Sequence, residues 1–276
     1  MISVGLLLSD KKRIGFIGYG KMGDAIGSAV HQSNLDITIM ATEENPERQI
    51  WIKQHREKLR LTSIDEVIKQ SDLVFLAIKP QKLSDLSNKL SLPFKQNQLV
   101  VSMLAGVSID TCCKKLNHNH VVRIMPNTPA ILAKGVTGAC FLNHISDNQK
   151  AFCVEILSTF GNVIELQDES HLDIMTAISG SGPAFFYRMV NAFVDFSVKK
   201  GLPKSLAEKA VVSTMIGAGY MLSEFGDPKK QIEQVSSPNG TTLAGLKKMD
   251  DHHFDDIIKN VLNSTLDRAK ELSKEC

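Results

Sequence analysis

The sequence predicts an α/β fold, in which a mostly parallel sheet with helices on both faces is followed by an all-helical C-terminal domain. Three observations lead to this expectation. Short apolar runs alternate with helix-like segments up to about residue 166, which is typical of a parallel sheet covered by helices. A glycine triplet directly follows the first apolar run and opens a helix. Beyond residue 167 the pattern is helical throughout.

Seven apolar runs are the expected strands. They are Arg13–Gly18, Ile37–Ala41, Leu73–Ile78, Leu99–Met103, Val121–Met125, Gly135–Leu142 and Asn162–Leu166. The last two flank a helical stretch over residues 147–159 and extend the sheet. The sheet domain should therefore comprise residues 1–166, and the helical domain residues 167–276.

The helices of the second domain are separated by breaks in which glycine and proline stand together, as they do where one helix ends and the next begins. Two of these helices, Ala184–Val198 and Ala207–Leu222, are apolar around much of their circumference. A small helical domain cannot bury that much apolar surface alone. We expect a homodimer through these helices. Packing against the sheet domain only is the alternative.

The charges and cysteines exclude several classes of function. The 276 residues include 32 Lys and Arg against 30 Asp and Glu, a net charge of +2, which gives no basic surface for nucleic acid or an anionic membrane. No apolar run reaches the roughly 18 residues that would span a bilayer, and Met1–Leu8 lacks the basic start of a signal peptide, so we expect a cytoplasmic protein. Five cysteines without a C-x-x-C pair favour reduced thiols.

Gly18, Gly20 and Gly23 form a G-x-G-x-x-G motif between the first strand and its helix. In this position Gly18 allows the tight turn, Gly20 lets the backbone approach a pyrophosphate, and Gly23 lets the helix pack on the strand. The order of strand, triplet and helix predicts a Rossmann-type site for NADH or NADPH. Lys21 and Met22, inside the motif, are candidate contacts as well.

Glu43 follows Thr42 at the end of the second strand, twenty residues after the motif. An acid there hydrogen-bonds the adenosine ribose hydroxyls of NAD and repels the 2′-phosphate of NADP. Asn45 and Arg48 lie close by in the sequence and could accommodate that phosphate, and Glu43 could be a solvated loop residue, so the preference stays open. Lys79 either faces phosphate or is an ordinary cation at a strand end. Candidate contacts after later strands are Ala77, Lys79, Pro80, Ala105 and Gly106.

Later segments present small polar groups where a core would not need them. Asn127 stands between two prolines after a strand, and Ser181 stands in a glycine-rich segment that we expect to break a helical run. Gln234–Thr242 combines small residues and hydroxyls, with Pro238 suited to a first helical turn. A helix N-terminus without bulky side chains binds carboxylates or phosphates. A capped turn between helices is the alternative for this segment by itself.

Together these motifs resemble the pyrroline-5-carboxylate reductase family over nearly the whole chain. The most specific matches are Ala177–Phe185, Gly201–Pro203 and Val235–Thr242, in the order and spacing of that family. One departure is Asn239, where the family usually has a second glycine before Gly240. Because Asn tolerates positive φ better than other residues with a side chain, we expect the turn to be kept.

The resemblance implies NAD(P)H-dependent reduction of the C=N bond of 1-pyrroline-5-carboxylate to L-proline, the last step of proline biosynthesis. It implies that backbone N–H groups around Gly240 and Thr241 hold the substrate carboxylate, and that the Thr242 hydroxyl hydrogen-bonds the ring nitrogen and helps its protonation. It also suggests rings of dimers. Secondary candidates for contacts with substrate or nicotinamide are Asn127, Ser181 and Ser236.

Two other functions fit the same two-domain plan. A β-hydroxyacid reductase would usually carry a lysine in the first helix of the second domain, and Ala184–Asn191 contains none; a reductase of another imine is a related alternative. A non-catalytic NAD(P)-sensing dimer would not need the polar loops at Asn127–Thr128 and Thr241–Thr242.

Some polar clusters are better explained by structure than by chemistry. Asp250–Asp256 mixes Asp and His at short spacing, but Asp250 or Asp251 as the N-cap of the last helix, with acids in its first turn, explains it better than a metal site. We expect no metal. His118 and His120 stand in a polar segment before a strand and are expected to be solvent-exposed, and Trp51 is expected to pack on a helix.

Overall fold

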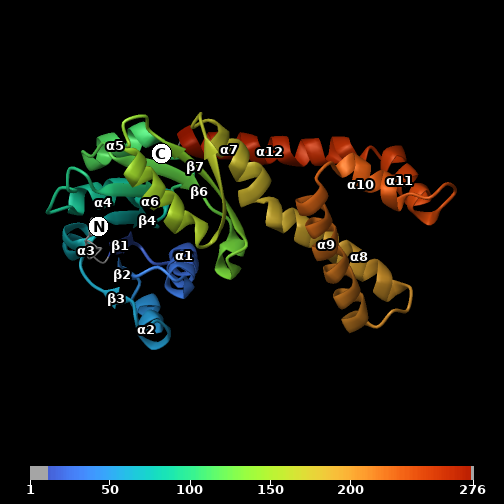
Figure 1. Ribbon diagram of the computed structural model, residues 1–276, viewed down its shortest axis with the longest axis horizontal. Coiled ribbons are helices and arrows are strands. Elements are labelled where there is room, and N and C mark those ends of the chain that lie inside the picture. Colours follow the sequence, from blue (N-terminus) through green and yellow to red (C-terminus); the bar gives the residue numbers. More distant parts are fainter. Residues whose placement is uncertain (1–11, 275–276) are drawn as a thin grey trace, which may run out of the picture. The chain divides into compact units, whose positions relative to one another are not determined.

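The computed structural model describes residues 12–274, which form two compact units (Figure 1). Within the described residues, unit 1 runs to Gly180 and includes the chain again from Thr265, and unit 2 is Ser181–Ser264. Unit 1 therefore continues past the boundary expected between residues 166 and 167, because Leu172 and Met175 are buried in the core of the sheet. Two features considered above, residues 1–8 and the last cysteine, lie outside the described residues.

Unit 1 is built on an eight-stranded sheet with the strand order β3-β2-β1-β4-β5-β6-β7-β8. Neighbouring strands are parallel except β6 and β7, which are antiparallel. The strands are β1 Lys12–Ile17, β2 Ile37–Thr42, β3 Arg60–Leu61, β4 Leu73–Leu76, β5 Leu99–Ser102, β6 Val121–Met125, β7 Gly135–Phe141 and β8 Gly161–Leu166. All seven expected strands are present, which confirms the predicted fold class. The two-residue strand β3 was not expected, because it is too short to show a periodic pattern.

Helices cover both faces of the sheet and enclose two apolar cores. In the first, the rings of Phe16 on β1 and Phe75 on β4 stack with centroids 4.9 Å apart. In the second, Val74 and Leu76 of β4 pack with Val67 of α3. The helices of this unit are α1 Lys21–Gln32, α2 Pro46–His55, α3 Ile64–Gln70, α4 Leu83–Lys89, α5 Ile109–Leu116, α6 Asp147–Ser158 and α7 His171–Met175, with 3₁₀ turns at Pro80–Lys82 and Thr128–Leu132.

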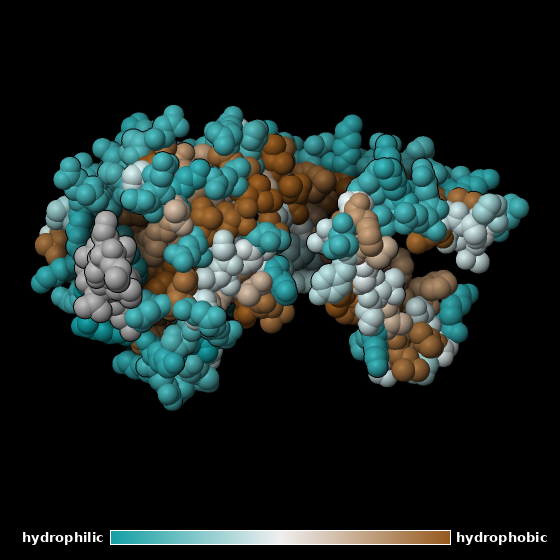
Figure 2. Space-filling model, in the orientation of Figure 1, coloured by the Kyte–Doolittle hydropathy of each residue, from teal (hydrophilic) through white to brown (hydrophobic). Residues whose placement is uncertain are grey.

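Unit 2 consists of helices. These are α8 Gly182–Lys199, α9 Lys204–Phe225, α10 Pro228–Val235, α11 Thr241–Asp251 and the first part of α12 Phe254–Lys274. α8 and α9 pack against each other, yet many of their large apolar side chains stay exposed, and Figure 2 shows apolar surface over these two helices. The most exposed include Phe186, Tyr187, Phe193, Phe196 and Tyr220. None of the helices within residues 12–274 is long and apolar enough to cross a membrane.

The start of the last helix differs from the expectation. Asp250 and Asp251 end α11 instead of capping α12. Asp251 forms an ion pair with Lys248 one turn earlier, at 2.8 Å. The chain reverses at His253, which has a φ of 52°, and α12 begins at Phe254. The helix α11 thus continues through Asp250 and Asp251, which the sequence suggested as the N-cap of the last helix.

Candidate active site

The turn after β1 has the geometry of a dinucleotide-binding loop. Gly18 has a φ of 85°, which glycine adopts without strain, and a Cβ there would lie 2.7 Å from the carbonyl oxygen of Ala77. Gly20 precedes α1 without a side-chain cap, and a Cβ there would meet no described atom within 4 Å. This open space, beside the free N–H groups of the first turn of α1, fits a pyrophosphate. We therefore regard the residues present as a fit for NAD(P)H.

Side chains of opposite charge hold this glycine turn in place. Glu43 accepts hydrogen bonds from the backbone N–H of Tyr19 at 3.0 Å and from that of Asn45 at 2.9 Å. Arg48 donates from Nε to the carbonyl oxygen of Tyr19 at 3.1 Å, and its Nη2 lies 3.3 Å from the Asp24 carboxylate on α1. Both backbone groups of Tyr19 are therefore fixed by the protein itself, which preorganises the turn.

A cavity of about 430 Å³ opens at the carboxyl ends of β1, β2 and β4. Half of the cofactor residues expected from the sequence line it, namely Gly18, Gly20, Thr42, Glu43, Ala77 and Lys79. The other half lies in the first turn of α1, the 3₁₀ turn after β4 and the turn after β5; these residues are Lys21, Met22, Gly23, Pro80, Ala105 and Gly106. The carboxyl ends of neighbouring parallel strands are where ligands of open α/β sheets bind.

Four charged residues that the sequence did not single out line the same cavity, Glu44, Lys82, Asp85 and Lys89. Lys89 forms an ion pair with Glu44 at 2.5 Å, and this hydrogen bond lowers the pKa of the Glu44 carboxyl. Lys82 lies 3.6 Å from Asp85. Lys82 ends the 3₁₀ turn and Lys89 ends α4, and only the fold brings α4 beside the end of β2.

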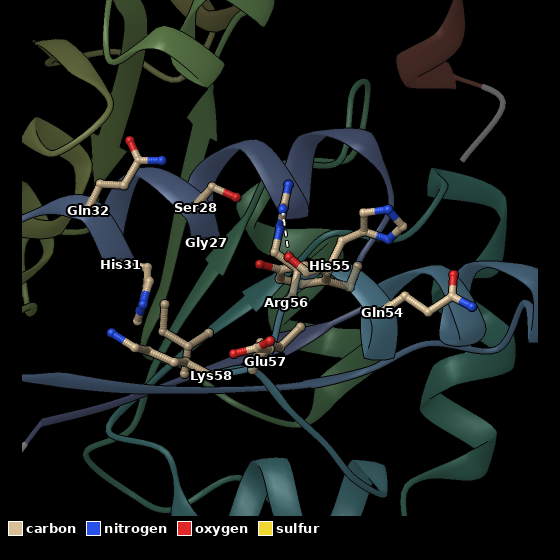
Figure 3. Close-up of a pocket in the computed structure, with 12 residues that line it drawn as sticks. Gly27, Ser28, His31, Gln32, Gln54, His55, Arg56, Glu57 and Lys58 are labelled. Atoms are coloured by element: carbon tan, nitrogen blue, oxygen red, sulfur yellow. Dashed lines mark hydrogen bonds between the residues drawn. The ribbon is translucent and has the colours of Figure 1, made fainter.

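A second cavity, of about 310 Å³, lies between α1 and the segment that follows α2 (Figure 3). The side chain of Tyr19 reaches it from the glycine turn, and the Tyr19 hydroxyl would clash with a Cβ at Gly27. Arg56 donates to both carboxylate oxygens of Asp24, at 2.7 and 3.0 Å. This cavity therefore holds residues that support the turn, whereas the first cavity is lined by the turn itself.

Asn127 joins three elements of unit 1. Its Oδ1 accepts from the N–H of Val136 on β7 at 2.9 Å, and its Nδ2 donates to the carbonyl oxygen of Ser179 at 3.1 Å. Ser179 belongs to a π-helical turn, Thr176–Gly180, which leads into α8. The sequence predicted a break here: the π turn, a type of turn that is frequent at functional sites, ends at Gly180, and a bend at Ser181 separates it from α8. Asn127 is 7% exposed, so it has a structural role, and its contact with substrate or nicotinamide stays a prediction.

The segment expected to bind an anion forms a tight turn followed by a helix. The N–H of Gly240 donates to the carbonyl oxygen of Ser237 at 2.9 Å, which closes the turn. Asn239 has a φ of 59°, which confirms that asparagine takes the conformation expected of glycine. Pro238 lies inside the turn and not in the first helical turn, contrary to the expectation, because α11 begins only at Thr241.

The hydroxyls proposed for the substrate side differ in their environments. Thr242 is half-buried in the first turn of α11, and Thr241 is exposed beside it. The Ser236 hydroxyl donates to the carbonyl oxygen of Ile232 at 2.6 Å and so completes the end of α10. Ser181 precedes α8 without capping it. These positions belong to unit 2, whereas Asn127 belongs to unit 1.

Three titratable side chains outside these segments, one His and two Cys, are buried inside unit 1. His118 is 6% exposed, which corrects the expectation of a solvated residue. Its Nε2 lies 2.7 Å from the carbonyl oxygen of Gln98, and burial lowers its pKa. Burial raises the pKa of Cys112 to about 11 and also raises that of Cys153, so both thiols stay protonated at neutral pH. Among residues 12–274, no three His, Cys, Asp or Glu side chains come together as a metal site would require.

Comparison with known proteins assigns the family. The family model for pyrroline-5-carboxylate reductase dimerisation matches residues 169–272. Pyrroline-5-carboxylate reductase 2 of Bacillus subtilis is 34% identical over 269 residues, covering 96% of each chain. The chain belongs to the pyrroline-5-carboxylate reductase family. The reductase of Pseudomonas aeruginosa is also 34% identical, over 266 residues that cover 95% of this chain and 97% of the relative.

Solved structures of the reductase family have the same fold. The enzyme of Coxiella burnetii superposes with a TM-score of 0.85 at 29% identity, covering 96% of this chain and 99% of that one. The Plasmodium falciparum enzyme, solved with NADP bound, gives a TM-score of 0.81 at 25% identity, covering 95% of this chain and 98% of that one. A second family model, described as NADP oxidoreductase coenzyme F420-dependent, matches residues 13–106. That match spans the glycine turn and the cavity beside it.

Proposed function

We infer that this chain is an NAD(P)H-dependent oxidoreductase that reduces the C=N bond of 1-pyrroline-5-carboxylate to L-proline, the last step of proline biosynthesis. Its full-length similarity to pyrroline-5-carboxylate reductases, at 34% identity over 96% of the chain, carries the assignment. The glycine turn and its cavity agree with it, because their geometry fits a dinucleotide. Alternatives with the same two-domain plan, a β-hydroxyacid reductase or a non-catalytic sensor, have no comparable support.

Residues of unit 1 hold and orient the cofactor in this proposal. The reduced nicotinamide, when bound, supplies the hydride. The free N–H groups at the start of α1 hold the pyrophosphate beside Gly20, as a helix N-terminus does. The turns after β4 and β5, with Ala77, Lys79, Ala105 and Gly106, are placed at the carboxyl edge of the sheet, where they can line the nicotinamide path.

Residues of unit 2 bind the substrate in this proposal. Because the N–H of Gly240 already closes the turn with Ser237, the N–H groups of Thr241 and Thr242 are the ones left for the carboxylate. α11 begins without a side-chain cap, so no neighbouring side chain competes for them. The Thr242 hydroxyl hydrogen-bonds the ring nitrogen and supports its protonation, and Ser181, Ser236 and Asn127 give secondary support. The protein's contribution to rate is then mainly orientation.

The exposed apolar faces of α8 and α9 support a homodimer in this proposal. Both helices lie inside residues 169–272, the segment that matches the dimerisation model. Unit 1 is thus the cofactor-binding domain, and unit 2 is the substrate-binding and dimerisation domain. Assembly of dimers into a ring and a cytoplasmic location complete the proposal.

A cofactor oxidation assay tests the activity. The purified protein should oxidise NADH or NADPH with 1-pyrroline-5-carboxylate and form proline, and it should do so much faster than with a panel of hydroxy acids, keto acids and other cyclic imines. Loss of absorbance at 340 nm and direct measurement of proline give two independent readouts. If the pyrroline is not turned over with either cofactor, the assignment is wrong.

Thr242→Val tests the residue that we place at the ring nitrogen. Valine keeps the shape but removes the hydroxyl, so kcat/KM for the pyrroline should fall on the order of 100-fold, while the dissociation constant for the cofactor stays unchanged. The matched control is Thr241→Val, the exposed neighbour in the same helical turn, for which we expect a small effect. Equal kcat/KM values for Thr242→Val and the unaltered protein would contradict the role of this hydroxyl.

A further inference from the structure

We propose that Glu43 makes this enzyme select NADH over NADPH. The inference rests on the proposed function, because it concerns the cofactor of that reaction. Glu43 follows the last residue of β2 and lines the 430 Å³ cavity together with Gly18 and Gly20 of the nucleotide turn. An acid at this end of β2 accepts hydrogen bonds from the hydroxyls of the adenosine ribose and repels a 2′-phosphate.

The carboxylate of Glu43 is fixed in this position. One of its oxygens accepts from the N–H of Tyr19 at 3.0 Å and the other from the N–H of Asn45 at 2.9 Å. The backbone is also held, since Gln49 donates to the carbonyl oxygen of Glu43 at 2.5 Å. A carboxylate oxygen can accept more than one hydrogen bond, so ribose hydroxyls can still bind. A 2′-phosphate, in contrast, would meet a negative charge that cannot turn away without losing two hydrogen bonds.

Arg48, the cation that could have accepted a 2′-phosphate, is committed elsewhere. Its Nε donates to Tyr19 at 3.1 Å, and its Nη2 lies 3.3 Å from Asp24. Its guanidinium also stacks over Trp51, with 4.0 Å between the central carbon and the ring centroid. Arg48 is not among the residues that line the cavity. The helix residue Trp51 therefore packs as the sequence predicted, and in doing so it keeps Arg48 away from the cofactor.

The lysines that line the cavity are balanced by acids, so the cavity has no net positive charge. Lys89 is paired with Glu44 and Lys82 faces Asp85. The charged lining consists of three lysines and three acids, which are Lys79, Lys82, Lys89, Glu43, Glu44 and Asp85. NADPH carries a phosphate of nearly two negative charges that NADH lacks, and a cavity with balanced charges and a fixed acid at the ribose end disfavours it.

Cofactor binding without substrate tests the proposal. Titrations of NADH and NADPH, followed by nicotinamide fluorescence, should give a dissociation constant for NADPH at least about tenfold above that for NADH. Glu43→Gln keeps an acceptor oxygen but removes the charge, so NADPH should bind more tightly and the ratio should shrink about tenfold. The control Glu47→Gln removes an exposed acid on α2 that does not line the cavity and should leave the ratio unchanged.

The result is independent of turnover. Equal or tighter binding of NADPH by the unaltered protein would overturn the proposal, and so would an unchanged ratio in folded Glu43→Gln. If Glu43→Gln does not fold, competition of adenosine 2′,5′-bisphosphate and AMP against NADH on the unaltered protein decides the same point, because these two nucleotides differ only in the 2′-phosphate. A protein that binds NADH selectively but does not reduce the pyrroline would contradict the proposed function and leave this inference standing.

Discussion

Beneath the nucleotide turn, the side chain of Tyr19 fills space that is free only because Gly27 has no side chain. Tyr19 is fully buried, with its ring edge-to-face against Phe16 at a centroid distance of 5.3 Å. Its hydroxyl occupies the place where any side chain at Gly27 would begin. The backbone of the same residue is held by Glu43 and Arg48. The glycine motif can therefore contain the large ring of Tyr19, because Gly27 on α1 has no side chain that would occupy the same space.

Gly27→Ala should destabilise the protein although alanine favours helices. The added methyl would clash with the Tyr19 hydroxyl, and overpacking of this kind costs about 1–3 kcal/mol, more than the gain of about 1 kcal/mol in helix propensity. Urea unfolding measures the free energy directly. The control is Ser28→Ala on the next residue, whose hydroxyl is buried without a partner among the described residues, so its loss should cost little.

Urea unfolding of a double variant tests whether the Tyr19 hydroxyl is the group with which the added methyl clashes. Tyr19→Phe removes the nearest atom, so the double variant should recover part of the stability that Gly27→Ala loses. If Gly27→Ala is as stable as the unaltered protein, the ring is free to move and the fit described here is incorrect.

At the scale of elements, a buried histidine links the starts of β5 and β6. His118 hydrogen-bonds the carbonyl oxygen of Gln98, directly before β5, and its ring packs against Phe94 with 5.3 Å between centroids. The ring of His120 lies 5.8 Å away and that of His144 5.5 Å beyond it. Burial lowers the pKa of both His118 and His120, and neighbouring imidazoles lower it further.

Stability should therefore fall on acidification. The unfolded chain takes up protons near the ordinary histidine pKa of about 6.5, whereas the folded protein takes them up only at lower pH. The free energy of unfolding should therefore keep its full value above about pH 6.5. It should decrease as the pH falls from there towards the lowered pKa values of the two histidines in the folded protein. Urea unfolding at several pH values between 7.5 and 5 measures this, and His118→Gln, which does not titrate, should flatten the dependence. A variant with the same pH dependence as the unaltered protein would exclude His118 as its source.

Elements whose sequences show a clear apolar pattern were predictable, whereas elements that lack such a pattern were not. Five of the seven longer strands were identified because a buried parallel strand is a continuous apolar run, and the last two because they flank a helical stretch. The short β3 and the π turn at Thr176–Gly180 were missed: the first has no period, and the second is contacted by Asn127 through a hydrogen bond to Ser179, 52 residues apart, which no local pattern reveals. The start of α12 was also misplaced, because a run of Asp and His fits either end of a helix.

At the scale of the whole molecule, α8 and α9 present an apolar groove of about 300 Å³ between them. It is lined by Met189, Val190, Phe193, Ala210, Val211, Thr214, Met215 and Ala218. Exposed apolar surface of this extent is typical of an interface, and the match of this segment to the dimerisation model supports a second copy as its partner.

Sedimentation should give a mass of at least two chains of 30.4 kDa. Phe193→Glu places a charge on a groove residue that is 61% exposed, so the equilibrium should shift towards the monomer at micromolar concentration. Ile50→Glu makes the same change at a similarly exposed apolar residue on α2, 57% accessible, and should leave the mass unaltered. A monomeric unaltered protein would contradict the proposed assembly.

The sequence by itself determined the fold class, the nucleotide turn and the family, because these depend on local signals: apolar runs, a spaced glycine triplet and motifs in a fixed order. Only the tertiary structure decided how charges are paired. Glu43 and Arg48 stand five residues apart, and their spacing after β2 allows either to face the cofactor, but Tyr19, Asp24 and Trp51 hold Arg48 elsewhere. Hydrogen bonds between distant residues fix a side chain's direction, and their partners cannot be read from spacing along the chain.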